Sequence, residues 1–413
     1  MNRKFFNYEN SLLVVMFLTF GLVFMDRMSF NFLMPFISKD LGLSNTQSGL
    51  VLGILSLFFV LSTIVFSSLS DILGSKKRML IIFVILFSTA TLSVGFITNV
   101  PSLIVIRAIM GITEGPVIPI ILAIVLAEST VKRRGFNMGL VKGSGPLMSG
   151  VVAPMMLIPI AVAYNWKWGF YTLAIPGFIL AFIIWRFVRE PKFEITGTEQ
   201  KPSWHELKKV FKQRNIWLCM LICIFFMINL TSFIGFSPLF LTNLLKYSDG
   251  YTQTFLTVFG LATFCWFFII PGISDKFGRK PTLIVFAFLS MVLPLLMATV
   301  SMSFSLTIVV LILFTCAFGY MPLFDAIIPS ESVPHKYAAS VMAGTILTGE
   351  VIGGTFGPII SGIMADKFDL HAPFVVGASA ACIAFLLSLG IKETQPGKAP
   401  APQKENLELL SAV

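Results

Sequence analysis

The sequence has few charged residues for its length, and little from which a catalytic or metal centre could be built. Charged residues make up 12% of the 413 residues and hydrophobic residues 56%, whereas about 25% of residues are charged in soluble proteins. The three histidines lie between apolar runs, and the five cysteines show neither metal-ligand spacing nor an even count. No nucleophile–base pair or nucleotide-binding loop is present. We therefore predict a membrane protein that is not an enzyme and needs no cofactor or metal.

Apolar runs are what the chain has in abundance, and they predict an all-α membrane protein. Twelve runs approach the roughly 20 residues that a spanning helix needs. The first is long enough that its helix must tilt, kink at Pro35 or project beyond the lipid. The runs are 11–37, 47–70, 79–98, 101–127, 136–160, 168–188, 215–243, 252–273, 281–300, 304–328, 337–364 and 372–391.

The basic residues are distributed unevenly between the two sides of these spans. With a cytoplasmic N-terminus, 23 of the 30 Lys and Arg residues fall on the cytoplasmic side, four on the opposite side and three within spans. This is the distribution that the positive-inside rule predicts. Both termini are therefore expected in the cytoplasm, with the chain in a plasma membrane, such as a bacterial inner membrane. The net charge of +10 then reflects topology and not nucleic-acid binding.

Landmarks recur along the chain at an offset of 203 or 204 residues. Asp26 corresponds to Asn229, and Asp71 corresponds to Asp275. Two similar six-helix bundles, related by an axis along the membrane normal, are typical of secondary transporters. The predicted parts are an N-terminal bundle (1–188), a cytoplasmic linker with a short amphipathic helix (189–214), a C-terminal bundle (215–392) and a disordered tail (393–413).

Two loops carry a family resemblance. The Ser-Asp-x-x-Gly-x-Lys-Lys pattern after the second span, and its copy after the eighth, resemble the signature loop of the major facilitator superfamily. The first copy departs from the family's loop in having Ser67 where glycine is usual and Ser75 where arginine is usual. An acidic residue at a helix end can pair in one conformation only and so latch the halves; for the lysines, positive-inside anchoring explains the pattern equally well. The expected gating residues are Asp71, Gly74, Lys76, Lys77, Asp275, Gly278, Arg279, Lys280 and, near the cytoplasmic end of the tenth span, Asp325.

Four ionisable residues lie inside the first and fourth spans. Asp26 and Arg27 are adjacent, while Arg107 and Glu114 are seven residues apart, which places them near one helix face. A charge at the centre of a bilayer costs several kcal/mol, and such residues usually mark a transport pathway or a proton relay. A buried ion pair that only holds helices together is the alternative.

This set of charges, with Gly-Ile-Thr-Glu-Gly around Glu114, resembles the anion:cation symporter family. Members of that family carry sugar acids, hexuronates, aromatic acids and other organic anions, commonly with protons. In its galactonate symporters the matching acids are protonated, and the matching arginines contact the substrate or the proton carriers. The resemblance implies that Asp26 and Glu114 carry protons, and that Arg27 and Arg107 bind the anion. Arginine suits that task, because it binds a carboxylate through two hydrogen bonds without losing its own proton.

Three further residues are candidates for substrate binding. Lys142 could contact the substrate or extend to the cytoplasmic interface. Glu350, the deep carboxylate of the eleventh span, could bind protons, accept a substrate hydroxyl or pair with Lys142. Asn229 retains the hydrogen-bonding capacity of its counterpart Asp26 without the charge.

The expected function is import of an organic anion with protons by alternating access, by a monomer in a lipid bilayer. One alternative is a proton-driven exporter of hydrophobic compounds, which Gly145-Pro146 in the fifth span favours and the three cations in the spans disfavour. The other is a membrane sensor that does not transport. The short tail after Lys392 disfavours it.

Overall fold

The computed structural model describes residues 8–73, 75–130, 132–191, 204–300 and 302–395, and the regular secondary structure in these ranges is entirely helical. Ten of the described helices are long and apolar enough to cross a membrane, and Phe304–Phe314 and Ala372–Ser388 are shorter apolar helices. The all-α prediction is confirmed. The described helices are consistent with the order of the twelve predicted spans, and the number of spans stays a prediction.

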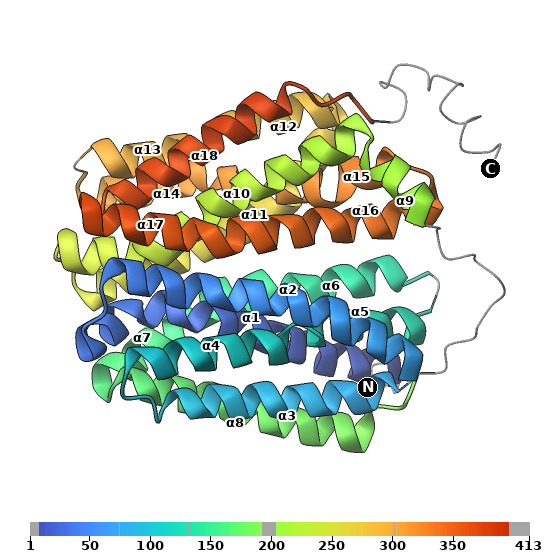
Figure 1. Cartoon of the computed structure of the whole chain (residues 1–413), viewed down its shortest axis with the longest axis horizontal. Helices are drawn as coiled ribbons and strands as arrows, with labels where there is room; N and C mark the ends of the chain where they lie inside the picture. Colours follow the sequence, from blue (N-terminus) through green and yellow to red (C-terminus); the bar gives the residue numbers. More distant parts are fainter. Residues whose placement is uncertain (1–7, 74, 131, 192–203, 301, 396–413) are drawn as a thin grey trace, which may run out of the picture.

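The N-terminal half holds the first six spans, which lie in the lower layer of Figure 1. The third and sixth spans are single helices, and α1 continues through Pro35 without a break. The helices are α1 (Tyr8–Leu41), α2 (Asn45–Leu73), α3 (Lys76–Val94), α4 (Val100–Glu114), α5 (Val117–Glu128), α6 (Arg134–Leu147), the π-helical turn η1 (Met148–Val152), α7 (Ala153–Ala163) and α8 (Trp166–Phe187).

The C-terminal half repeats this arrangement in the upper layer of Figure 1, after a short helix, α9 (Trp204–Phe211), in the predicted linker. Its elements are α10 (Arg214–Leu239), η2 (Phe240–Leu244), α11 (Asp249–Phe277), α12 (Arg279–Leu289), α13 (Val292–Thr299), α14 (Phe304–Phe314), η3 (Thr315–Phe318), η4 (Leu323–Ile327), α15 (Ile328–Glu331), α16 (His335–Thr348), η5 (Gly349–Gly354), α17 (Thr355–Lys367) and α18 (Ala372–Ser388).

Several spans are interrupted near their middle. The fourth span breaks between α4 and α5, where Gly115 and Pro116 follow Glu114, because proline offers no backbone N–H to continue the helix. The fifth and eleventh spans instead pass through the π-helical turns η1 and η5. Such turns are rare and frequently occur at functional sites. The interruptions therefore mark the middle of these spans as a candidate location for the functional site.

The two halves meet through closely packed small residues. The Cβ that an alanine would add at Gly53 of α2 would lie only 2.3 Å from the Thr355 carbonyl of α17. On another side of the interface, Gly150 of η1 faces Gly260 of α11 in the same way. Glycine therefore permits backbones from the two halves to touch.

Asp366, at the end of α17, ties the halves together where α2 begins. Its carboxylate accepts hydrogen bonds from the backbone N–H groups of Asn45 (2.9 Å) and Thr46 (2.8 Å). These N–H groups begin α2 and have no partner within the helix, so the carboxylate of one half caps a helix of the other. The halves are consequently held together at this end, which is opposite the end where α1 begins.

Candidate functional site

A cavity of about 170 Å³ lies between the two halves, near the middle of the molecule. Both halves contribute to its wall, through α1, α2 and α4 on one side and α10, η5 and α17 on the other. Much of the wall is apolar and includes Met28, Met227 and Met321. The polar lining residues are Arg27, Asn31, Ser56, Arg107, Thr231 and Glu350.

Arg27, on α1, is paired across the interface. Its Nη2 donates to the Glu350 carboxylate at 2.5 Å and to the Ser56 hydroxyl at 3.2 Å. The guanidinium also lies over the Phe59 ring, 4.7 Å from the centroid. An aromatic face stabilises a cation where little water is present. The Phe59 ring therefore stabilises the charge of Arg27 from within the N-terminal half.

Arg107, on α4, is held more deeply and is only partly paired. It is 2% exposed, and its guanidinium lies 4.1 Å from the centroid of the Phe30 ring. Nε donates to the Val51 carbonyl at 3.0 Å, whereas Nη1 is buried without a hydrogen-bond partner among the described residues. Arg107 is thus a fixed cation that borders the cavity, and its Nη1 is a buried donor that no described residue satisfies.

Asp26 and Glu114 lie behind the two arginines and not at the cavity wall. They are 1% and 0% exposed. Asp26 accepts a hydrogen bond from the Thr91 hydroxyl at 2.6 Å. The carboxyl groups of Asp26 and Glu114 lie within hydrogen-bonding reach of each other. Glu114 interacts electrostatically with Asp26 and Arg107. Two carboxyl groups and an arginine therefore form one buried cluster.

The other predicted substrate ligands fall in different places. Glu350 lines the cavity, but its partner is Arg27 and not Lys142. Lys142 has an exposed side chain and is not at the cavity wall, which fits the alternative that it extends toward the interface. Asn229 is fully buried within the C-terminal half, where its amide donates to the Ser290 carbonyl at 3.2 Å. Among these three residues, we carry only Glu350 into the proposed site.

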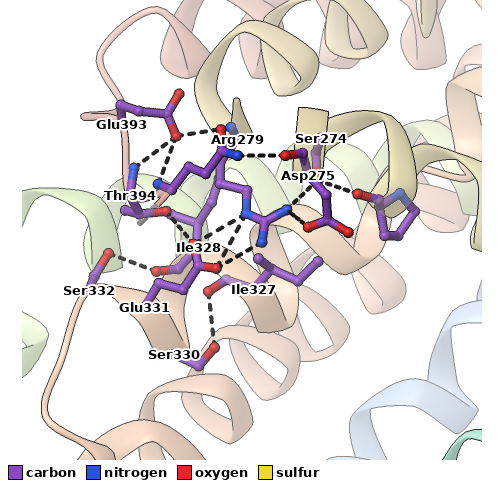
Figure 2. A network of polar contacts seen from close by, with 12 residues as sticks. Ser274, Asp275, Arg279, Ile327, Ile328, Ser330, Glu331, Ser332, Glu393 and Thr394 are labelled. Atoms are coloured by element: carbon purple, nitrogen blue, oxygen red, sulfur yellow. Dashed lines mark hydrogen bonds and ion pairs between the residues drawn. The ribbon is translucent and has the colours of Figure 1, made fainter. Parts of the chain in front are cut away.

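The loop after the eighth span forms the network drawn in Figure 2. Arg279 donates to Asp275 at 2.5 Å and to Glu331, on α15, at 3.0 Å. Glu393, after α18, caps α12 by accepting from the backbone N–H groups of Arg279 (2.9 Å) and Lys280 (3.1 Å). Partial burial opposes ionisation of Glu393, but these N–H donors outweigh it and lower the pKa of its carboxyl.

Gly278 is required at the start of this network. Its φ is +113°, and a Cβ there would lie 2.7 Å from a carboxylate oxygen of Glu393. The N-terminal half has a related contact, since Lys77 donates its backbone N–H to Glu190 at 3.0 Å. Glu190 and Glu393 are separated by the same offset of 203 residues as Asp26 and Asn229. Both loops are therefore tied to the chain that leaves the last helix of their own half.

The remaining predicted gating residues are placed only in part. The side chain of Asp71 and all of Gly74 lie outside the described residues, and the side chain of Lys76 is buried. Asp325 lies in the π-helical turn η4, is 8% exposed and interacts electrostatically with Lys142 of the other half. A gating role for these residues stays a prediction.

Three polar residues of the cavity wall were missed by the sequence analysis: Asn31, Ser56 and Thr231. Asn31 follows Arg27 by four residues, so helical spacing alone could have placed both on one face. Ser56 and Thr231 offer no such signal, because isolated hydroxyls within apolar runs usually bond the backbone of their own helix.

The fold and the site together define a membrane transporter whose binding cavity lies between two related helix bundles. Residues 16–343 match the family model described as Major Facilitator Superfamily, and the chain belongs to this superfamily of transporters. It is therefore not an enzyme.

The relatives of this chain are named for different functions. The hexuronate transporter of Bacillus subtilis (strain 168) is 32% identical over 187 residues, a match that spans 44% of this chain and only 43% of that protein. The probable L-galactonate transporter of Escherichia coli (strain K12) is 26% identical over 388 residues, covering 87% of this chain and 83% of that one. The multidrug resistance protein MdtG of Dickeya zeae (strain Ech586) is 23% identical over 409 residues, with 94% of each chain covered.

Among solved structures, the crystal structure of a D-xylose-proton symporter superposes with a TM-score of 0.81. The two chains are 15% identical, and the superposition covers 95% of this chain and 100% of the other. This similarity shows the shared fold alone.

Proposed function

We propose that this protein imports an organic anion together with protons by alternating access. The observation that carries the proposal is the layered arrangement of charge at the cavity. Arg27 and Arg107 lie at its wall, and Asp26 and Glu114 lie buried behind them. The substrate class is a sugar acid, hexuronate or other carboxylate, as the relatives that transport hexuronate and L-galactonate support.

Coupling between anion and proton follows from the position of Arg107, which lies between the cavity and the two acids proposed to carry protons. Its charge acts on Asp26 and Glu114 when no anion is bound. A bound carboxylate competes for that charge, and the two acids then hold protons more readily. Each cargo favours the other by the same factor, because linkage between two binding equilibria is reciprocal.

The direction of opening follows from the predicted topology. The end where Asp366 contacts α2 lies opposite the basic loops. Basic loops lie on the cytoplasmic side of a plasma membrane, so this end faces outward. We infer that the carrier is closed toward the outside here, and that it lies in a bacterial inner membrane. We expect the monomer to be the transporting unit, because each chain contains both halves of the cavity.

Export of hydrophobic compounds is the second candidate. A relative named as a multidrug resistance protein and the Gly145-Pro146 pair inside α6 favour it. Two arginines at the cavity wall disfavour cationic drugs, and a volume of about 170 Å³ is below the roughly 300–1,000 Å³ of sites for drug-sized ligands. A small organic anion agrees better with both observations.

A panel of labelled compounds in reconstituted vesicles tests the substrate class. With an inward proton gradient, we expect uptake of galactonate, glucuronate, benzoate or another organic acid, and no movement of tetraphenylphosphonium in either direction. Vesicles without protein are the control. Transport of tetraphenylphosphonium with no uptake of any acid would favour the exporter instead.

A further inference from the structure

The charge of the cavity wall is set by three ionisable groups. Arg27, Arg107 and Glu350 line the cavity, whereas Asn31, Ser56 and Thr231 are uncharged. Two arginines and one glutamate leave a single positive charge at the wall. With protons on Asp26 and Glu114, as the proposed function requires for a loaded carrier, one carboxylate neutralises the site.

Glu350 is placed to neutralise one arginine and leave the other available. Its carboxylate contacts Arg27 at 2.5 Å, and the two side chains are only 14% and 11% exposed. Glycine at position 354 leaves room for this contact. A Cβ there would lie 3.0 Å from Oε2 of Glu350 and 3.1 Å from the Ser56 hydroxyl. Arg107, in contrast, pairs with no carboxylate at the cavity wall and keeps a buried Nη1 without a partner among the described residues.

The backbone that carries Glu350 is itself unusual. Glu350 lies in η5, a π-helical turn within the eleventh span, and not in regular α-helix. A π-helical turn is less favourable than α-helix and is often retained at functional sites. Here the turn directs a carboxylate of the C-terminal half at an arginine of the N-terminal half.

We propose that Glu350 makes this carrier selective for monocarboxylates, by neutralising Arg27 so that only Arg107 remains for the carboxylate of the substrate. The inference rests on the proposed function and specifies its substrate class. A dicarboxylate would bring two charges to a site with one available cation, and its second carboxylate would be desolvated beside Glu350. An unpaired or like-charged group in a desolvated site is strongly disfavoured.

Matched pairs of acids test the inference on the purified full chain. Galactonate ends in a hydroxymethyl group where galactarate has a second carboxylate. Phthalate likewise has one carboxylate more than benzoate. Dissociation constants would be measured at pH 7 for wild type, Glu350→Gln and the double variant Arg27→Gln/Glu350→Gln. Wild type should bind the monocarboxylate of a pair at least about tenfold more tightly. Glu350→Gln should reduce that ratio at least about tenfold, and the double variant should restore it.

The outcomes separate this inference from the proposed function. If wild type takes up galactonate or benzoate but Glu350→Gln leaves the ratio within threefold of wild type, the charge-selection role is wrong and anion import stands. If wild type binds neither member of either pair, the pair is chosen from the acid that the labelled panel identifies; if that panel identifies no acid, both proposals fail. If Glu350→Gln does not fold, Glu350→Ala decides, because it also removes the carboxylate that neutralises Arg27; an unchanged ratio in that variant overturns the inference.

Discussion

Replacing Arg107 with alanine is expected to weaken binding of the transported anion at least about a hundredfold, or about 2.7 kcal/mol. Arg107 is buried, stacked on Phe30, and aligned by its bond to the Val51 carbonyl. The position of its guanidinium is therefore fixed before the anion arrives, and little conformational entropy is lost on binding. Charge-assisted hydrogen bonds contribute about 1.5–3 kcal/mol each, and a bidentate contact involves two of them.

Two control variants show whether the loss is specific. Arg107→Lys retains the charge but not the planar pair of donors, so it should bind the anion with intermediate affinity. Arg186→Ala removes an exposed arginine of α8 and should leave affinity unchanged. Isothermal titration on detergent-purified protein measures all three variants. Affinity for Arg107→Ala equal to that of wild type would remove Arg107 from the binding site.

Replacing Glu114 with glutamine is expected to abolish accumulation driven by a proton gradient, with a loss of at least about tenfold, while exchange of labelled for unlabelled anion continues. Glutamine matches glutamate in shape but cannot carry a proton. Glu114 is fully buried behind the cavity wall and does not line it, so the change leaves the anion site in place. Net import requires the protein to load and release protons, whereas exchange requires only the loaded states.

The measurement compares gradient-driven uptake with counterflow in the same vesicle preparation. Asp369→Asn, an exposed carboxylate in the turn between α17 and α18, is the matched control and should resemble wild type in both assays. If Glu114→Gln lost accumulation and counterflow to the same extent, the residue would be structural. That result would revive the alternative of an ion pair that only holds helices together.

Much of the fold could be predicted from the sequence because each span is long, apolar and bounded by charge. The offset between Asp26 and Asn229 even reveals the two halves. The interruptions were harder to predict, because a proline or glycine in a membrane helix does not always break it. Pro35 leaves α1 intact, whereas Gly115 and Pro116 end α4.

The candidate site was predicted in part. Residues close in the sequence, such as Asp26 with Arg27, share a local environment that spacing can indicate. Contacts between the halves depend on packing over several hundred residues. Glu350 therefore pairs with Arg27 and not with Lys142, which was one of the expected partners. Asn229 faces the interior of its own half. Repeat symmetry predicts the position of a residue and not its partner.

Proton movement during substrate entry tests the central claim most directly. Vesicles would contain the protein and an internal pH-sensitive dye. Galactonate, or another acid that the panel identifies, would be added outside at equal internal and external pH. Our account predicts that the lumen becomes more acidic as the labelled anion enters, and that Glu114→Gln removes the acidification. Entry of the labelled anion with no change in internal pH would contradict proton-coupled import.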